Sequence, residues 1–306
     1  METRTPSLHW LAQEIGFDTD LLRQFVYNRR EHIHLEKKKK TNGQIRTITV
    51  PSKQFKNALR IINRRLLQPI GFHKCFYLKP KSSFYEMLRS HRQFYFTWTC
   101  DIDDFYPSIS SRMIMNSLLA KGFDKENAEL LTRLTTHNNQ LPQGFPTSSS
   151  LAAFVLIPIL DRLEGLYPNH KLFVSLYADN VAISAKFDPR RFKGTIIRVF
   201  QKYKFRLDKF SGLEREGVRE IMGSVKKRGS GYLVARQYIR NLRDRIFSLS
   251  KDLEHANTKG FRKTVDSIRG KLAFVRTINA NQFNSLARHC DRLHVALVLP
   301  KSNSLS

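Results

Sequence analysis

Three short motifs decide the fold: DIDDFYPSI at residues 101–109, LPQGFPTSS at residues 141–149 and YADN at residues 177–180. The first motif ends an aromatic and β-branched stretch that predicts a strand, so this strand delivers Asp101 at its end. The third motif joins two apolar segments, LFVSLYA and VAISAKF, and therefore predicts a tight turn that carries Asp179. We expect the strand end and the turn to bring these two carboxylates together.

Two neighbouring carboxylates suit the chemistry of nucleotidyl transfer. This reaction needs two divalent metal ions about 4 Å apart, one to activate the attacking 3′-hydroxyl and one to hold the triphosphate leaving group. Magnesium takes oxygen ligands and is usually held by one or two carboxylates together with phosphates. Each motif alone is weak, since an acidic turn is usually ordinary turn chemistry. The order of all three along one chain makes the set specific.

The charge of the chain favours a nucleic-acid partner. Lys and Arg number 53 and Asp and Glu number 26, which leaves a formal net charge of +27. The positive charges of such a chain repel one another unless an anion binds to them. A nucleic-acid backbone is a favoured anion, because its binding also releases condensed counterions. Solubility or binding to a membrane surface is the alternative reading. It is less favoured because the basic residues are spread over the whole chain.

The remaining sequence predicts a mixed chain with an all-helical end. Leu8 to Asn28 has helical periodicity, and residues 32–50 predict a hairpin because TNGQ contains an Asn-Gly turn signal. A basic amphipathic helix is predicted over 53–67, and further helices over 111–121, 125–135, 147–164 and 189–203. A strand is predicted over 94–102 and a hairpin after Gly223. From Ala235 the sequence predicts helices rich in Arg and Lys. This order suits an α+β core with an added helical lobe.

The three motifs resemble the palm motifs of bacterial retron-type reverse transcriptases, namely their first acidic motif, their QG motif and their YADD box. GQIRTITVP resembles the fingers strand of that family, and SIRGKLAFVRTIN resembles a segment of its thumb. The resemblance implies an α+β right-hand polymerase fold with fingers, a palm with an antiparallel sheet and an all-α thumb. The implied parts are an N-terminal helical segment at 1–30, fingers at 31–95 and 111–148, palm at 96–110 and 149–232, and thumb at 233–306.

The resemblance also implies a catalytic centre with two Mg²⁺ ions, for which Mn²⁺ is a substitute. Asp101 and Asp179 would bind the metal through their carboxylates, and Ile102 through its backbone carbonyl. Asn180 stands where the family has its second catalytic Asp, so one charge is lost while an oxygen acceptor is kept. Activity could survive this change or be lost by it. Asp104 is expected to cap or orient rather than to bind metal.

Further roles are implied around this centre. Tyr106 would be the aromatic gate under the sugar that selects dNTPs, and Lys209 would supply positive charge to the leaving pyrophosphate. Other nucleotide-binding residues would be Arg46 with Lys39 or Lys40 on the fingers, and Gln143 and Gly144 of the QG motif. Met222, Gly223 and Ser224 would form the primer grip. The thumb would hold an RNA/DNA duplex through basic residues at helical spacings, with Arg236, Arg240, Arg243 and Lys271 as the candidates.

Two departures bear on the subgroup. The NAxxH and VTG elements of retron enzymes are replaced by EMLRSH and IMGS, in which His91 and Gly223 survive. We therefore favour a defence-associated relative that copies a dedicated non-coding RNA against phage. One alternative is a weakened or inactive polymerase fold that binds RNA or a partner. Another is protein-primed or template-independent DNA synthesis. A partner protein or a homo-oligomer is compatible with each.

The sequence also predicts a soluble, cytoplasmic protein. It shows no apolar run of about 20 residues for a membrane span and no apolar signal-peptide core. The three cysteines, Cys75, Cys100 and Cys290, have no CxxC spacing and are expected to be buried, reduced thiols.

Overall fold

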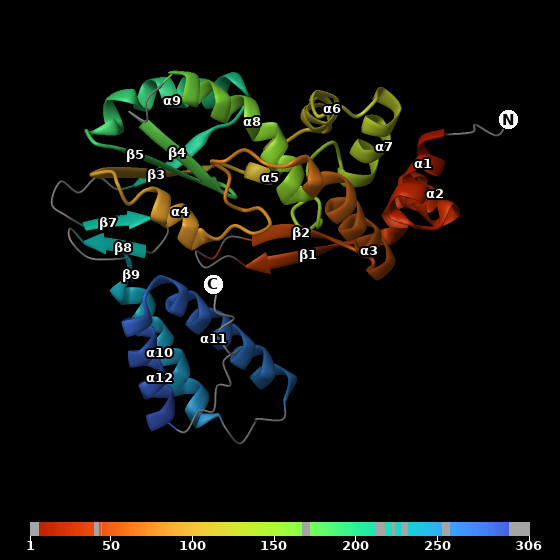
Figure 1. The fold of residues 1–306 in the computed structure, drawn as a ribbon. Coiled ribbons are helices and arrows are strands. Elements are labelled where there is room, and N and C mark those ends of the chain that lie inside the picture. The colour runs from red at the N-terminus through yellow and green to blue at the C-terminus, as the bar shows by residue number, and fades with distance from the viewer. Residues whose placement is uncertain are drawn as a thin grey trace. The chain divides into compact units, whose positions relative to one another are not determined.

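The computed structural model describes residues 6–39, 43, 45–166, 172–211, 218–221, 224–227, 232–252 and 258–293 (Figure 1). The chain divides into two compact units, which are described separately. The first unit contains residues 1–87, 99–183 and 189–210, and the second contains residues 88–98, 184–188 and 211–306. Antiparallel pairing and many helices occur together, so the predicted α+β class is confirmed.

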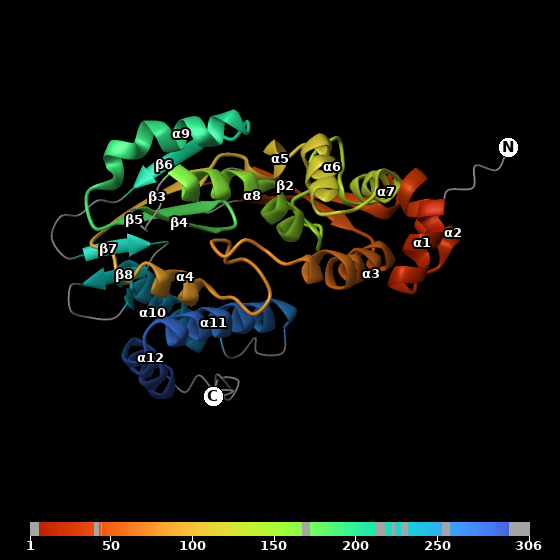
Figure 2. The same ribbon diagram turned by 45° about the horizontal axis from the view of Figure 1, so that its top comes forward.

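One four-stranded sheet carries the candidate site. Its strands lie in the order β4-β5-β3-β6, with bounds Leu172–Tyr177, Asn180–Ala185, Phe96–Ile102 and Leu207–Ser211. Helices α8 (Ser148–Leu166) and α9 (Lys193–Lys202) lie together on one side of this sheet (Figure 2), and α8 contacts both α9 and β4. A short 3₁₀ turn, Pro189–Phe192, precedes α9. The predicted hairpin of two apolar strands is β4–β5, whereas the edge strand β6 was not predicted.

A two-stranded sheet forms the predicted hairpin near the N-terminus. Strand β1 (Ile33–Lys39) pairs antiparallel with β2 (Ile45–Pro51), in a register that places Leu35 opposite Thr49. Most of the predicted Asn-Gly turn between them lies outside the described residues. The N-terminal helix predicted over residues 8–28 is two helices, α1 (Pro6–Ile15) and α2 (Thr19–Tyr27). The break occurs because Gly16 has a φ of 63°, which an α-helix cannot contain.

Helices complete the first unit around an aromatic core. Phe55 of helix α3 (Lys53–Ile62) packs between Phe25 of α2 and Phe145 of the QG motif, at centroid distances of 4.8 and 5.4 Å. The first unit also contains the following helical segments: the 3₁₀ turn Arg29–His32, the π-helical turn Asn63–Leu67, the 3₁₀ turn Gln68–Ile70, α5 (Phe105–Ser108), α6 (Ser111–Ala120) and α7 (Lys125–Thr135). Helix α4 (Phe84–Ser90), which was not predicted, crosses from this unit into the second.

The second unit contains a small sheet and three helices. Strands β7 (Val218–Ile221), β8 (Ser224–Lys227) and β9 (Tyr232–Val234) form an antiparallel meander, so the predicted hairpin after Gly223 is β8–β9 with β7 added. Helices α10 (Arg236–Lys251), α11 (Lys259–Ile278) and α12 (Ala280–Arg292) follow. The Gln282 side chain ties α12 to β9, because its amide donates to and accepts from the backbone of Val234.

The three cysteines are buried and free, as predicted. Burial raises the pKa of Cys75 to about 11 and that of Cys100 to about 12, so neither thiol ionises at neutral pH. Within the described parts of the chain, no helix combines the length and the apolar character that crossing a membrane requires.

Candidate active site

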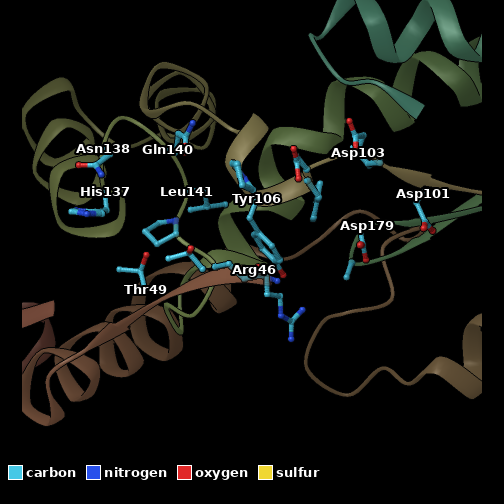
Figure 3. A pocket seen from close by; sticks show the side chains of 18 of the residues that line it. Arg46, Thr49, Asp101, Asp103, Tyr106, His137, Asn138, Gln140, Leu141 and Asp179 are labelled. Atoms are coloured by element: carbon cyan, nitrogen blue, oxygen red, sulfur yellow. The ribbon is translucent and has the colours of Figure 1, made fainter. Parts of the chain in front are cut away.

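A pocket of about 970 Å³ opens in the first unit where the predicted motifs meet. Its walls come from the β1–β2 hairpin, the segment 101–107, the loop 137–143, the β4–β5 turn and Lys209 of β6. Figure 3 shows Asp101 and Asp179 at one end of this pocket, Tyr106 and Arg46 in its middle, and His137 at the other end. Segments more than 150 residues apart in the sequence therefore share one cavity.

The two carboxylates come from adjacent strands. Asp101 lies near the end of β3, and Asp179 occupies the two-residue turn before β5, which neighbours β3 in the sheet. The amide of Ile102 donates a 2.7 Å hydrogen bond to the carbonyl of Asp179, which holds the turn against the strand. Burial raises the pKa of Asp179 and outweighs a backbone hydrogen bond that lowers it, and the negative charge of Asp101 raises it further. The mutual repulsion of the carboxylates is the electrostatic condition that a bound cation relieves.

Basic side chains already lie against this acidic end. The ammonium of Lys209 donates to Asp101 at 3.1 Å, and this hydrogen bond raises the pKa of Lys209. The side chain of Arg206 forms an ion pair with Asp103, and the backbone carbonyl of Arg206 accepts a 2.9 Å hydrogen bond from the amide of Asp103. Asp101 and Asp103 therefore each form an ion pair with a largely exposed basic side chain of the segment 206–209.

Asn180 is linked to the two carboxylates by a hydrogen bond to the adjacent Asp179. Its side-chain amide donates to the carboxylate of Asp179 at 3.1 Å, which lowers the pKa of Asp179 against the larger effect of burial. Asn180 does not line the pocket. Asp104 occupies the N-cap position of α5 in a left-handed conformation, but its side chain makes no capping hydrogen bond. The capping role expected for Asp104 is therefore wrong, and the orienting role given as its alternative stays a prediction.

Tyr106 forms part of the pocket wall beside the carboxylates. Its ring lies 5.0 Å from that of Phe105, and its hydroxyl lies 3.4 Å from the hydroxyl of Ser149 on α8. Burial raises the pKa of Tyr106, so the hydroxyl stays protonated. The ring is thus held from two sides and presents a fixed surface to the pocket.

The QG motif packs against the hairpin. The carbonyl of Gln143 accepts a 3.0 Å hydrogen bond from the amide of Thr49 on β2, and Gln143 lines the pocket. Gly144, which does not line it, has a φ of 128°; a Cβ there would lie 2.4 Å from the carbonyl oxygen of Thr49. Only glycine allows the backbone at position 144 to lie this close to β2. Gly144 therefore supports the pocket wall without being part of its surface. Lys39 and Arg46 of the hairpin line the pocket, and Lys40 lies outside the described residues.

Residues 37–211, more than half of the chain, match the family described as reverse transcriptase (RNA-dependent DNA polymerase). The chain belongs to this family. The matched segment includes every residue that lines the pocket except Leu35. The retron-type identification and the RNA-directed DNA polymerase activity predicted from the motifs are thereby confirmed.

Curated relatives of this reverse transcriptase are retron enzymes. It is 21% identical to Retron Ec86 reverse transcriptase of Escherichia coli over 298 residues, which cover 94% of this chain and 89% of the relative. It is 22% identical to Retron Mx162 reverse transcriptase of Myxococcus xanthus over 316 residues, which cover 89% of this chain and 64% of the relative.

One wall of this reverse transcriptase's pocket was not predicted. His137, Asn138 and Gln140 line it from a loop in which Asn138 and Asn139 are both left-handed, with φ of 49° and 60°. The amide of Ser111 donates to the carbonyl of Asn139, which anchors the loop beside α6. Consecutive asparagines favour such a turn. Nothing in the local sequence shows that the turn borders the pocket.

The predicted thumb residues of the reverse transcriptase belong to the second unit. Arg236, Arg240 and Arg243 are exposed on α10, and Arg243 donates to Ser285 of α12 at 3.1 Å. Lys271 on α11 is partly buried, which lowers its pKa. Ser224 begins β8, while Met222 and Gly223 of the predicted primer grip lie outside the described residues.

Proposed function

We propose that Asp101, Asp179 and the backbone carbonyl of Ile102 hold two Mg²⁺ ions, or Mn²⁺ in their place, during DNA synthesis. The donor set fits, because carboxylate and carbonyl oxygens are the ligands these ions prefer. The site also attracts a cation, since the Lys209 ammonium already lies on Asp101. The described residues contain no cluster of three or more His, Cys, Asp or Glu side chains suited to a metal. Two carboxylates therefore need substrate phosphates to complete the metal's ligands.

The bound ions would activate the primer's 3′-hydroxyl and stabilise charge on the triphosphate. The protein's own side chains would do the rest. Lys39, Arg46 and Lys209 would bind the phosphates, since they are the cations at the pocket wall. Tyr106, fixed by Phe105 and by Ser149, would exclude a ribose 2′-hydroxyl by its bulk.

We assign the parts of a right-hand polymerase to the fold on this basis. The β1–β2 hairpin with α3, α6 and α7 would form the fingers, the four-stranded sheet with α8 and α9 the palm, and α10–α12 the thumb. In the thumb, Arg236, Arg240, Arg243 and Lys271 would contact the phosphates of the RNA/DNA duplex. Their basic character and the net charge of +27 support this assignment.

We further propose that the template is a dedicated non-coding RNA and that synthesis serves defence against phage. The retron relatives and the motif set support an RNA template. Sequencing the RNA and DNA that co-purify with the protein tests this directly. One enriched structured RNA, with DNA complementary to part of it, is the expected result. A random sample of cellular RNA, with no complementary DNA, would contradict a dedicated template.

Asn180 favours one rival function, an RNA-binding protein that does not polymerise. Asn180→Asp separates the two, because it removes the amide that donates to Asp179 and adds a carboxylate. For an active enzyme, we expect primer extension by both forms, with half-maximal activity at lower Mg²⁺ in Asn180→Asp. Extension by Asn180→Asp alone would instead show that the natural chain is a polymerase fold that only binds.

A further inference from the structure

The stretch that follows Glu36 of β1 and contains β2 and α3 has no acidic residue. Between Glu36 and Glu86 lie 49 residues with thirteen Lys and Arg and no Asp or Glu. At the average composition of the chain, about four acidic residues would occur there. Among those of the thirteen that the structure describes, Lys39 and Arg46 alone line the pocket. The proposed catalytic function therefore leaves most of this charge without a role.

Helix α3 gathers part of this charge on one face. Its buried residues are Phe55, Ala58, Leu59 and Ile62, all at 1% exposure or less. At about 100° per residue, the opposite side of the helix carries the basic residues. They are Lys53, Lys56, Arg60 and, one turn further into the π-helical segment, Arg64. We call these four residues the α3 basic face. Lys56 is partly exposed and the other three are exposed.

The α3 basic face is not neutralised by the protein. None of its four side chains makes an ion pair with any residue that the structure describes. Other helices pair their arginines locally, as in Arg23 with Asp20 on α2 and Arg133 with Glu129 on α7. Arg65, next to the face, is also used internally, since it donates to the carbonyl of Glu14. An anion from outside the chain is the partner that this arrangement fits.

We propose that the α3 basic face binds the phosphate backbone of RNA outside the polymerase pocket. The face and the pocket belong to the same compact unit, and α3 starts two residues after β2, which contributes Arg46 and Thr49 to the pocket. The same RNA can therefore use both surfaces. Side chains at i, i+4 and i+8, here Lys56, Arg60 and Arg64, recur about every 6 Å along a helix and can follow successive phosphates.

An anionic membrane would be the other partner for a basic amphipathic helix, and the structure disfavours it. A helix that lies in a membrane surface inserts its apolar face among the lipids. In α3 that face is committed to the core, because Phe55 and Leu59 are fully buried. Only charge remains available, and charge alone fits a polyanion in solution better than a lipid layer.

Salt-dependent RNA binding by two matched variants tests the proposal. R60Q/R64Q removes two charges from the α3 basic face, and R23Q/R133Q removes two arginine charges that are already ion-paired. The probe is a labelled RNA hairpin with a single-stranded tail, titrated without dNTPs at salt concentrations from about 50 to 200 mM. Each phosphate contact contributes about 0.7–0.9 to the slope of log K against log salt. We expect R60Q/R64Q to flatten that slope by about 1.5 and R23Q/R133Q to leave it near the wild-type value.

Equal slopes for the two variants would overturn the proposal, because the effect would then be one of net charge alone. Thermal unfolding checks that both variants are folded, as exposed substitutions should be. Binding of the same variants to vesicles of anionic phospholipid is measured in parallel. Loss of vesicle binding with unchanged RNA binding in R60Q/R64Q would identify a membrane partner instead. Because the assay contains no dNTPs, its outcome is independent of whether the proposed catalytic centre is right.

Discussion

Gly144→Ala offers a sharp test of how the QG motif shapes the pocket. The new Cβ would lie 2.4 Å from the carbonyl oxygen of Thr49 and 2.8 Å from Cγ2 of Ile48. A carbon and a carbonyl oxygen normally approach to about 3.3 Å, so the two backbones must separate by about 0.9 Å. That shift breaks the hydrogen bond from Thr49 to Gln143, which is worth about 0.5–1.5 kcal/mol.

Gly122→Ala is the matched control. Gly122 has a φ of 91° but no atom within 4 Å of an added Cβ, so only the positive-φ strain of about 1–3 kcal/mol applies. Gly144→Ala has comparable strain and loses the hydrogen bond as well. We therefore expect its free energy of unfolding in urea to fall below that of Gly122→Ala by about 0.5–1.5 kcal/mol.

Activity should separate the two variants further. A displacement of about 1 Å in a substrate-binding wall costs about 10²-fold in rate. We expect kcat/KM for dNTP incorporation to fall by about that factor in Gly144→Ala and to stay near wild type in Gly122→Ala. Equal stability and equal activity in both variants would refute the close approach between the QG motif and β2.

Two other predictions concern the centre itself. Asp179→Asn should raise the melting temperature in metal-free buffer at neutral pH, because burial and Asp101 raise the pKa of Asp179 and so disfavour its charged form in the folded chain. The gain should shrink once the pH falls below that raised pKa, and it should be lost below the ordinary carboxyl pKa of the unfolded chain, where wild type is protonated in both states. A lower melting temperature of Asp179→Asn at neutral pH would contradict this. Tyr106→Val should increase incorporation of rNTPs relative to dNTPs by about 10- to 100-fold in competition assays. Tyr106→Phe, which keeps the ring and loses only the contact with Ser149, should discriminate like wild type; equal discrimination in all three would remove Tyr106 as the gate.

The elements with strong local signals were predicted well. The β1–β2 and β4–β5 hairpins, α6, α7 and α8 all follow apolar periodicity or turn chemistry, and α8 forms despite Pro158. Strand β6 was missed because Leu207–Ser211 is short and mostly exposed; it is specified by pairing beside β3 rather than by its own pattern. Helix α4 is seven residues long and offers too few turns for periodicity to appear.

The candidate site was predictable to the extent that its residues lie in motifs. Asp101, Tyr106, Gln143 and Asp179 meet at one pocket, as their motifs imply. The loop of His137 and its neighbours was not predictable, since its place in the pocket depends on pairing with the chain beside Ser110. Tertiary contacts of this kind leave no periodic trace in the sequence.

Asp101 and Asp179 are proposed to form the polymerase centre. Primer extension on a primed RNA template with Mg²⁺ and dNTPs, using Asp101→Asn, Asp179→Asn and Asp103→Asn, tests it most directly. Asp103 is the control, because it lines the same pocket and also pairs with a basic side chain but is not one of the proposed metal ligands. We predict that the first two variants lose extension by about 10³-fold or more while Asp103→Asn retains most of it. Wild-type extension by Asp101→Asn or Asp179→Asn would contradict the claim.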